Sequence, residues 1–166
     1  MRSDTLVIDI GQNLVGVYSV VNRKYVPYRG ECIRLAIERI EKALEVVTYN
    51  GNRYDIVELQ KLKKGLGIEG ELRIRGRHTD MQEVCWSTRI LGSSLYNTYN
   101  YHFSTVPPFP DTHEGSNRTD VYKTFKLWRL WKQDRLRILD GQYLQAQHNK
   151  PSQRTRQKQR AVERRR

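Results

Sequence analysis

The chain has 166 residues, which suits one domain with an appendage and is too short for two ordinary domains. Its formal net charge is +12, and residues 121–166 hold 14 of the 30 Lys and Arg residues but only 3 of the 18 Asp and Glu residues. Clustered positive charge favours a polyanionic partner, either nucleic acid or an anionic membrane surface. No apolar run approaches the roughly 20 residues that a bilayer requires, which argues against a membrane-spanning protein.

The first part of the chain has the pattern of a β-hairpin followed by a basic loop. Residues 5–10 and 14–21 are rich in β-branched residues, and the turn composition GQN separates them. Residues 22–30 contain Pro27 and Gly30 and predict a polar loop. Its basic residues are Arg23, Lys24 and Arg29, and they alternate with tyrosines. Such a loop can bind RNA phosphates and stack on bases, although an ordinary solvated loop has the same composition.

Helical and extended patterns alternate in the middle of the chain. Isoleucine, leucine and valine recur at spacings of three and four from Glu31 to Val47, which predicts an amphipathic core helix. Residues 48–69 are ambiguous between helix and loop. Residues 70–77 predict a strand that ends in a basic turn, and Thr79 with Gln82 matches a capping box that opens a helix ending near Gly92. An Arg-Gly-Arg turn before a helix suits phosphate binding.

The last third of the chain predicts one more strand, a proline-rich segment and a basic helix. Residues 99–106 have a strand pattern, and residues 107–118 should be extended because three prolines interrupt them. Residues 119–139 form a second amphipathic pattern, whose aromatic side is a possible protein-docking face. Its rings are Phe125, Trp128 and Trp131. From residue 148 onward there is no apolar periodicity, so the tail should be extended on RNA.

The order of these pieces resembles the universal ribosomal protein eleven family of the small subunit. The residues that carry the resemblance are Pro27 and Tyr28 of the basic loop, Gly76 and Arg77 of the turn, and Thr105, Pro107, Pro110, His113, Gly115 and Arg118 of the proline-rich segment. The resemblance implies an α/β fold, with a ribonuclease-H-like mixed sheet and two packed helices. It divides the chain into a domain at residues 1–118 and a basic C-terminal extension at 119–166, made of a helix about 119–139 and an extended tail.

The same resemblance implies a structural role on the ribosomal platform, without catalysis, cofactor or metal. The partners would be small-subunit rRNA and neighbouring platform proteins, and the membrane is excluded. Tyr, Asn and Ile are abundant and no transit peptide is seen, so we expect a mitochondrial ribosome and an organelle-encoded protein, with a cytoplasmic location as the alternative. The residues expected to contact rRNA are Arg23, Lys24, Arg29, Arg73, Arg75, Arg77, His113, Arg118, Lys150, Arg154, Arg156, Lys158, Arg160, Arg164, Arg165 and Arg166.

Two alternatives stay open. Asp9 and Gly11, in the segment VIDIGQNLVGV, also resemble the start of RuvC-like nucleases, in which acidic residues on adjacent strands hold divalent metals. Glu58 could be a second ligand there. Asp134 and Asp140 do not supply the closely spaced acidic pair expected on the last helix of that family. A viral or phage protein that binds RNA through its basic tail is the other alternative.

Overall fold

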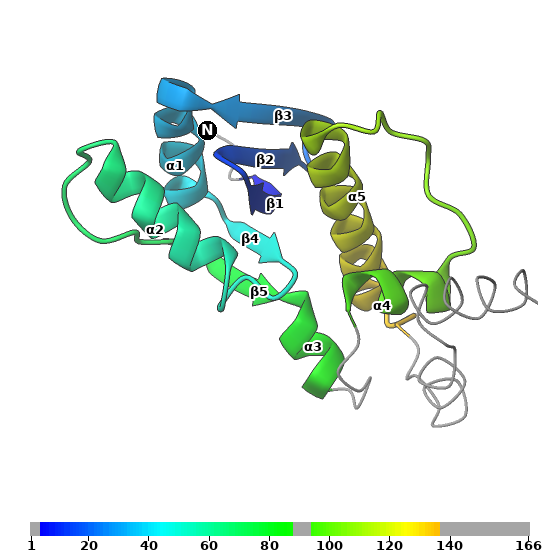
Figure 1. Cartoon of the computed structure of the whole chain (residues 1–166). Helices are drawn as coiled ribbons and strands as arrows, with labels where there is room; N and C mark the ends of the chain where they lie inside the picture. Colours follow the sequence, from blue (N-terminus) through cyan, green and yellow to red (C-terminus); the bar gives the residue numbers. More distant parts are fainter. Residues whose placement is uncertain (1–3, 88–93, 137–166) are drawn as a thin grey trace, which may run out of the picture.

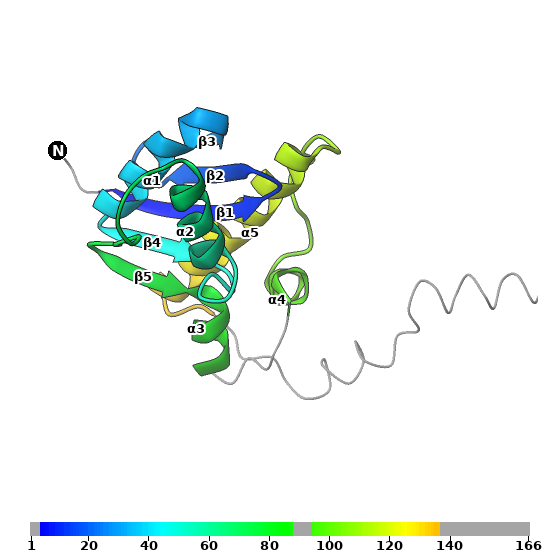
Figure 2. The same ribbon diagram turned by 60° about the vertical axis from the view of Figure 1, so that its left-hand side comes forward.

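The computed structural model describes residues 4–87 and 94–136, which form a mixed five-stranded sheet with helices on both faces (Figure 1). The strands are β1 (Thr5–Gly11), β2 (Leu14–Ser19), β3 (Lys24–Arg29), β4 (Glu45–Thr48) and β5 (Arg77–Asp80). Their spatial order is β3-β2-β1-β4-β5, as Figure 2 shows from top to bottom. The predicted α/β class, with a mixed sheet and packed helices, is confirmed.

The sheet has an antiparallel half and a parallel half. β1 pairs antiparallel with β2, and β2 pairs antiparallel with β3. β1 pairs parallel with β4, and β4 pairs parallel with β5. The carboxyl ends of β1, β4 and β5 therefore meet at one edge of the sheet, where open α/β sheets usually bind their ligands.

One face of the sheet is covered by two helices and a purely apolar core. The 3-10 turn η1 (Gly30–Cys32) leads into α1 (Ile33–Lys42), and α2 (Asp55–Gly65) lies beside α1 (Figure 1). Leu6 and Ile8 of β1 point to this face and pack with Ile37 and Ile40 of α1. Burial of these side chains fixes the inward face of β1, because neighbouring residues of a strand point to opposite faces.

The opposite face is covered mainly by α5 (His113–Lys132), with α4 (Leu95–His102) beside it and α3 (Met81–Ser87) below β5 (Figure 1). Val7 of β1 and Val47 of β4 pack there with Val121 and Leu127 of α5. The rings of Phe125, Trp128 and Trp131 are partly buried against the same core. They therefore pack on the chain itself, and the additional protein partner suggested for them stays a prediction.

The hairpin prediction is confirmed, but the basic loop after it is a strand. Residues 24–29 pair along their whole length with β2. Proline is acceptable in β3 because an edge strand leaves one side of its backbone without a ladder partner. The predicted helix from Glu31 to Val47 is too long: α1 ends at Lys42, and Val46 and Val47 belong to the buried strand β4.

Three later predictions are also wrong in detail. Residues 70–76 form no strand, and β5 begins only at Arg77. Thr79 is not a helix cap, because it lies in β5 and its hydroxyl donates a 2.7 Å hydrogen bond to Glu45. Residues 99–106 do not form a strand, since α4 runs through their first half to His102.

The last helix starts earlier than its apolar pattern indicated. α5 begins at His113 instead of Thr119, and the hydroxyl of Thr112 accepts a 3.0 Å hydrogen bond from the N–H of Gly115 as its N-cap. The division predicted at residues 118 and 119 thus lies inside α5. In the part of the chain that the structure describes, no helix is long and apolar enough to cross a bilayer.

Candidate active site

An asparagine of α5 reaches across the sheet to the carboxylate of Asp9 on β1. The Nδ2 group of Asn117 donates 2.8 Å hydrogen bonds to both the backbone oxygen and the side-chain Oδ2 of Asp9. Asp9 is two residues beyond Val7, so it points to the same face, toward α5. Asn117 is 4% exposed, and it holds both the backbone and the carboxylate of Asp9, with one hydrogen bond to each.

A glycine makes this approach possible. Gly16 of β2 is the partner of Asp9 in the β1–β2 ladder, and a Cβ at Gly16 would lie 1.7 Å from Oδ1 of Asn117. The free space above Gly16 is also bordered by Tyr25 of β3, whose hydroxyl donates a 2.8 Å hydrogen bond to Oδ1 of Asn117. Tyr25, Asn117 and Asp9 form one continuous hydrogen-bonded network over the bare backbone of β2.

A second carboxylate is fixed against the end of β1. Asp55 is in the first turn of α2, is 4% exposed, and accepts a 2.9 Å hydrogen bond from the backbone N–H of Ile10. The ladder between β1 and β4 ends at Val7 and Val47, so this N–H has no strand partner on that side. Asp55 satisfies the N–H, and its carboxylate is thereby placed next to Asp9.

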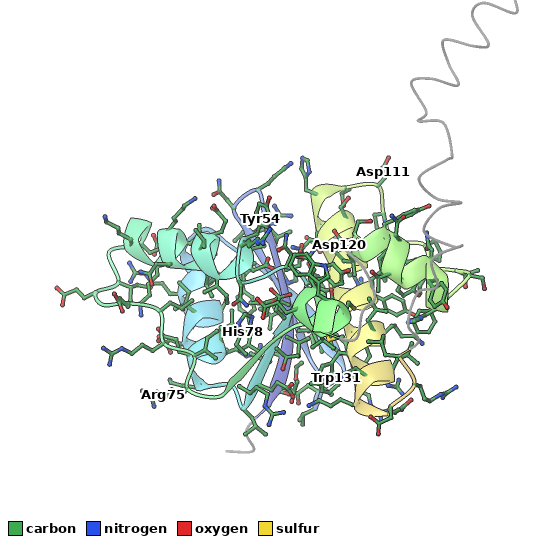
Figure 3. All side chains as sticks on the ribbon, turned by 90° about the horizontal axis from the view of Figure 1, so that it is seen from below. Tyr54, Arg75, His78, Asp111, Asp120 and Trp131 are labelled. Carbon is green, nitrogen blue, oxygen red and sulfur yellow. The ribbon has the colours of Figure 1, made fainter. Side chains whose placement is uncertain are left out.

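A third carboxylate, Asp120, comes from α5 one turn after Asn117. Figure 3, which shows the molecule from below, labels Asp120 on α5 and Tyr54, the N-cap residue of α2. Asp120 also lies 3.8 Å from Nζ of Lys123, an ion pair along the helix. The site therefore collects one acid each from β1, α2 and α5.

These three acids repel one another electrostatically. Burial, together with the charges of Asp55 and Asp120, raises the pKa of Asp9 to about 8. Burial, with contributions from Asp80 and Asp120, raises the pKa of Asp55 to about 7. Burial also raises the pKa of Asp120, which Lys123 opposes. Desolvated carboxylates with raised pKa values are typical of an acid-base or cation site.

Asp80 has a structural role beside this cluster. One of its oxygens accepts hydrogen bonds from the N–H groups of Asn50 (2.7 Å) and Gln82 (3.0 Å), and the other accepts one from Asn52 (3.0 Å). Asp80 thus opens α3 and holds the turn between β4 and α2. Because that turn leads directly to Asp55, Asp80 helps to place the second acid.

Carboxylate oxygens are the donors that a hard divalent cation such as Mg²⁺ or Mn²⁺ prefers. Asp9, Asp55 and Asp120 supply such oxygens on a desolvated surface. Among residues 4–87 and 94–136, no three His, Cys, Asp or Glu side chains form a closed group that could hold an ion. The charges of Asp55 and Asp120 both act on the carboxyl of Asp9, whose pKa they raise together with burial.

The basic residues predicted to bind RNA fall into separate regions. Arg73 and Arg75 are exposed, and Figure 3 shows Arg75 on the side of the molecule away from α5. The N–H of Arg75 donates to the backbone oxygen of Glu41, and that of Arg77 donates to the backbone oxygen of Leu44. A Cβ at Gly76 would lie 2.1 Å from the backbone oxygen of Leu44. This turn packs against the end of α1 and the residues before β4, so the N–H groups of Arg75 and Arg77 are already bonded within the chain. The RNA contacts expected from the side chains of Arg73, Arg75 and Arg77 stay a prediction.

The other predicted residues lie nearer the carboxylates. Arg23 occupies the β2–β3 turn, Lys24 and Arg29 are at the two ends of β3, and His113 and Arg118 are on the first turns of α5. Arg29 pairs with Glu114 at 3.5 Å. The predicted RNA contacts in the tail lie outside the described residues: Lys150, Arg154, Arg156, Lys158, Arg160, Arg164, Arg165 and Arg166.

Sequence reasoning named Asp9 only within the nuclease alternative, and it did not name Asp55 or Asp120. Glu58, the suggested second ligand, pairs with Lys61 at 2.6 Å on an exposed part of α2, and Asp55 takes the position beside Asp9. Asp134 follows the end of α5 and Asp140 lies outside the described residues. The available signal was Asn117 and Asp120 three residues apart, a spacing that places both on one face of a helix.

Comparison with known families identifies the superfamily of the chain. A family model described as the RNase_H superfamily matches residues 11–150, most of the chain. The chain belongs to the ribonuclease H superfamily. The match begins two residues after Asp9, so the assignment of Asp9 rests on its place in β1 and on its contacts. No curated protein matches the sequence.

A solved structure shares the fold of this ribonuclease H superfamily member. The family B DNA polymerase from the hyperthermophilic archaeon Pyrobaculum calidifontis matches with a TM-score of 0.57 and 14% identity, over 79% of this chain. The match spans 25% of the polymerase chain, so this protein corresponds to about a quarter of that length.

The family match overturns the resemblance to a small-subunit ribosomal protein. The matched family is the RNase_H superfamily, and the degenerate motif residues have other roles here. Gly76 allows close packing on Leu44, and Gly115 allows the N-terminus of α5 to approach Pro110. The predicted platform role in translation, with no catalytic residue, is therefore wrong.

Proposed function

We propose that this protein is a metal-dependent nuclease that hydrolyses phosphodiester bonds of nucleic acid at Asp9, Asp55 and Asp120. The observation that carries the proposal is the placement of two buried carboxylates at neighbouring residues of β1: Asn117 of α5 donates to Asp9, and the N–H of Ile10 donates to Asp55 of α2. Asp120 follows Asn117 by one helical turn. Membership of the ribonuclease H superfamily supports it. It also agrees with the alternative that the segment around Asp9 suggested.

The carboxylates would hold divalent cations, which supply Lewis-acid stabilisation of a phosphoryl oxygen and activate water when bound. Other residues of the chain hold these carboxylates in position. Asn117 fixes the orientation of Asp9 through two hydrogen bonds, and the N–H of Ile10 fixes Asp55. The mutual repulsion of the three acids favours cation binding, because a divalent cation relieves the same repulsion that raises their pKa values.

The chain also has the charge needed to attract a polyanion. Its net charge is +12, although the carboxylates themselves are negative. On α5, Nζ of Lys126 lies 5.0 Å from the centre of the Phe103 ring and Arg129 lies 5.7 Å from that of Phe125, contacts that keep the cations close to the helix surface. The basic residues near β3, α5 and the tail are proposed phosphate contacts. The mitochondrial location stays a prediction.

The proposal is tested with purified full-length protein, labelled single-stranded and duplex DNA and RNA, and Mg²⁺ or Mn²⁺. We expect cleavage that EDTA stops and that Asp9→Asn lowers by at least about 100-fold, because one metal-binding oxygen loses its charge. The matched control is Glu58→Gln, which removes another acid of α2, one that pairs with Lys61 at 2.6 Å, and should cleave normally. Full activity of Asp9→Asn, or absence of cleavage of all four substrates, would refute the proposal.

A further inference from the structure

A pocket of about 350 Å³ lies between the β2–β3 hairpin, α5 and the segment before α5. Among the described residues, its lining is dominated by aromatic rings and two arginines and contains no acidic side chain. The lining residues are Tyr18, Arg23, Tyr25, Pro107, Phe109, Arg118, Val121, Tyr122 and Phe125. Nothing in the proposed chemistry at Asp9 requires such a pocket, so its purpose needs a separate explanation.

Arg118 is at the centre of the aromatic wall. Its guanidinium carbon lies 5.0 Å from the centre of the Phe109 ring and 5.6 Å from that of Tyr25. Flat rings and guanidinium planes are the groups on which nucleobases stack, and a guanidinium also binds phosphate through paired N–H donors. Arg23, in the β2–β3 turn, adds a second positive charge. The lining thus suits a ligand that is both planar and anionic.

The pocket is connected to the candidate active site through a shared wall. Tyr25 lines the pocket and donates its hydroxyl to Asn117, which in turn donates to Asp9. Arg118 directly follows Asn117 on α5, and Asp120 is two residues further on. A strand whose phosphate lies at Asp9 and Asp120 would therefore have a neighbouring nucleotide at this pocket.

The size of the pocket limits what can enter. A volume of about 350 Å³ is at the low end of the range for small-molecule sites and accommodates one nucleotide rather than a stacked pair. A base in a continuous duplex is covered on both faces by its neighbours, so it cannot stack on protein rings without leaving the helix. The occupant must consequently be a nucleotide that is unpaired or displaced from its stack.

We propose that the pocket lined by Tyr25, Phe109 and Arg118 holds one unpaired nucleotide of the nucleic acid substrate, next to the phosphodiester that is cut. The base stacks on the aromatic wall, and Arg118 and Arg23 bind its phosphate. This proposal rests on the proposed nuclease function for its substrate. The enzyme then selects single-stranded segments, or duplexes with an unpaired nucleotide, over continuous duplex.

Binding of a short labelled single strand to the full-length protein tests the pocket, with EDTA present so that the strand stays intact. We expect Phe109→Ala to weaken binding roughly 5- to 100-fold, the usual effect of losing one stacked base. Arg118→Gln should weaken binding and reduce the salt slope by about one phosphate contact. The matched controls are Tyr96→Ala and Arg53→Gln, which change an exposed ring below Lys123 and an exposed arginine over Trp86.

An abasic nucleotide moved along the strand locates the stacked base. At one position of the strand, the abasic nucleotide should weaken binding to the natural protein. At that position the natural protein and Phe109→Ala should bind with equal affinity, because the strand has no base there to stack on the ring of Phe109. If Phe109→Ala and Arg118→Gln bind like the controls, or if no abasic position has this effect, the pocket proposal is wrong.

The two proposals fail separately. Metal-dependent cleavage with unchanged binding by Phe109→Ala leaves the nuclease standing and removes the pocket. Position-dependent loss of binding without any cleavage leaves the pocket standing and removes the nuclease. Under cleaving conditions, Phe109→Ala should also lose most of the preference for substrates with an unpaired nucleotide, whereas Tyr96→Ala should keep it.

Discussion

The two faces of the sheet are built from the same strands but differ in chemistry. On the α1 and α2 face, Leu6, Ile8 and Ile37 pack in a hydrophobic core, beside which the buried Lys63 of α2 pairs with Glu41 of α1 at 2.6 Å. On the α5 face, Val7 gives way two residues later to Asp9, which Asn117 reaches across the backbone of β2. The strand alternation of β1 thus supplies a stabilising face and a site face at once.

Stability and function therefore depend on different sets of residues. The aliphatic residues of the first face contribute hydrophobic burial, whereas Asp9 on the second face and Asp55 at the start of α2 hold carboxylates whose desolvation costs stability. Substitutions of the aliphatic residues should lower the free energy of unfolding and leave the folded protein active. Substitutions on the second should change activity more than stability.

The largest change in stability is expected from Ile37→Ala on α1. Ile37 is 1% exposed, and removal of its buried methyl and methylene groups should cost about 2–5 kcal/mol of unfolding free energy. Urea denaturation measures this. The control is Leu35→Ala on the same helix, which is 56% exposed and should change stability by less than about 0.5 kcal/mol. A loss of activity per folded molecule in Ile37→Ala would break the division between the faces.

Gly16→Ala should damage the site with a smaller loss of stability. The new methyl group would overlap Oδ1 of Asn117, so the asparagine must move and its bonds to Tyr25 and Asp9 must weaken. We expect a loss of about 1–3 kcal/mol in urea denaturation, with a larger loss of metal-dependent cleavage. Gly11→Ala is the control, because a Cβ there meets nothing within 4 Å. Equal cleavage by the two variants would contradict the role given to Gly16.

Asp9→Asn should raise stability in metal-free buffer, and the gain should depend on pH. The pKa of Asp9 is about 8 in the folded state and 3.8 in its ordinary state, so the folded protein binds this proton more tightly. Its contribution to stability therefore falls as pH rises from about 4 to 8, and the full cost is present above pH 8. Asparagine keeps an oxygen that can accept from Asn117 and carries no charge.

Thermal unfolding in EDTA checks this prediction. The Tm of Asp9→Asn should exceed that of the natural protein at pH 8, by about 2–4 °C for each kcal/mol of relieved repulsion, and the two should converge near pH 4. A variant that is less stable at pH 8, or whose Tm advantage is independent of pH, would show that Asp9 is not held in a repulsive cluster.

The smallest effect is expected from Arg29→Gln at the end of β3. Arg29 and Glu114 are 3.5 Å apart with side chains 54% and 45% exposed, so solvent screens their attraction. We expect a change within about 0.5 kcal/mol in urea denaturation. If Arg29 also contacts a substrate phosphate, as its sequence position suggested, the salt slope of nucleic acid binding should decrease by about one contact. A loss above 2 kcal/mol would mean that the β3–α5 junction is a major source of stability.

Local patterns gave much of the framework correctly. The GQN turn and the β-branched runs around it predicted the hairpin, because a two-residue turn and period-two burial are properties of neighbouring residues. The isoleucine spacing predicted α1 for the same reason. Asp9 could be proposed as a site residue from its place on the first strand.

The errors arose where long-range contacts override local preference. Val46 and Val47 continue the helical spacing of α1, yet they pair with β1 and β5 because burial between two strands is worth more there than another turn of helix. Residues 70–76 alternate like a strand, and Leu72 and Ile74 do pack on the core, but the backbone of this segment does not join the ladder.

The sequence by itself determined the α/β class, the hairpin, the excess of positive charge in the tail and the presence of an acid on β1. Only the tertiary structure decided that Asp55 and Asp120 join Asp9, because their encounter depends on where β4 leaves β1 and how α5 crosses the sheet. It also decided the function of Gly16, since the space that Asn117 occupies exists only once β2 lies beneath α5. Site residues separated by about a hundred positions meet through packing, and packing is a property of the whole fold.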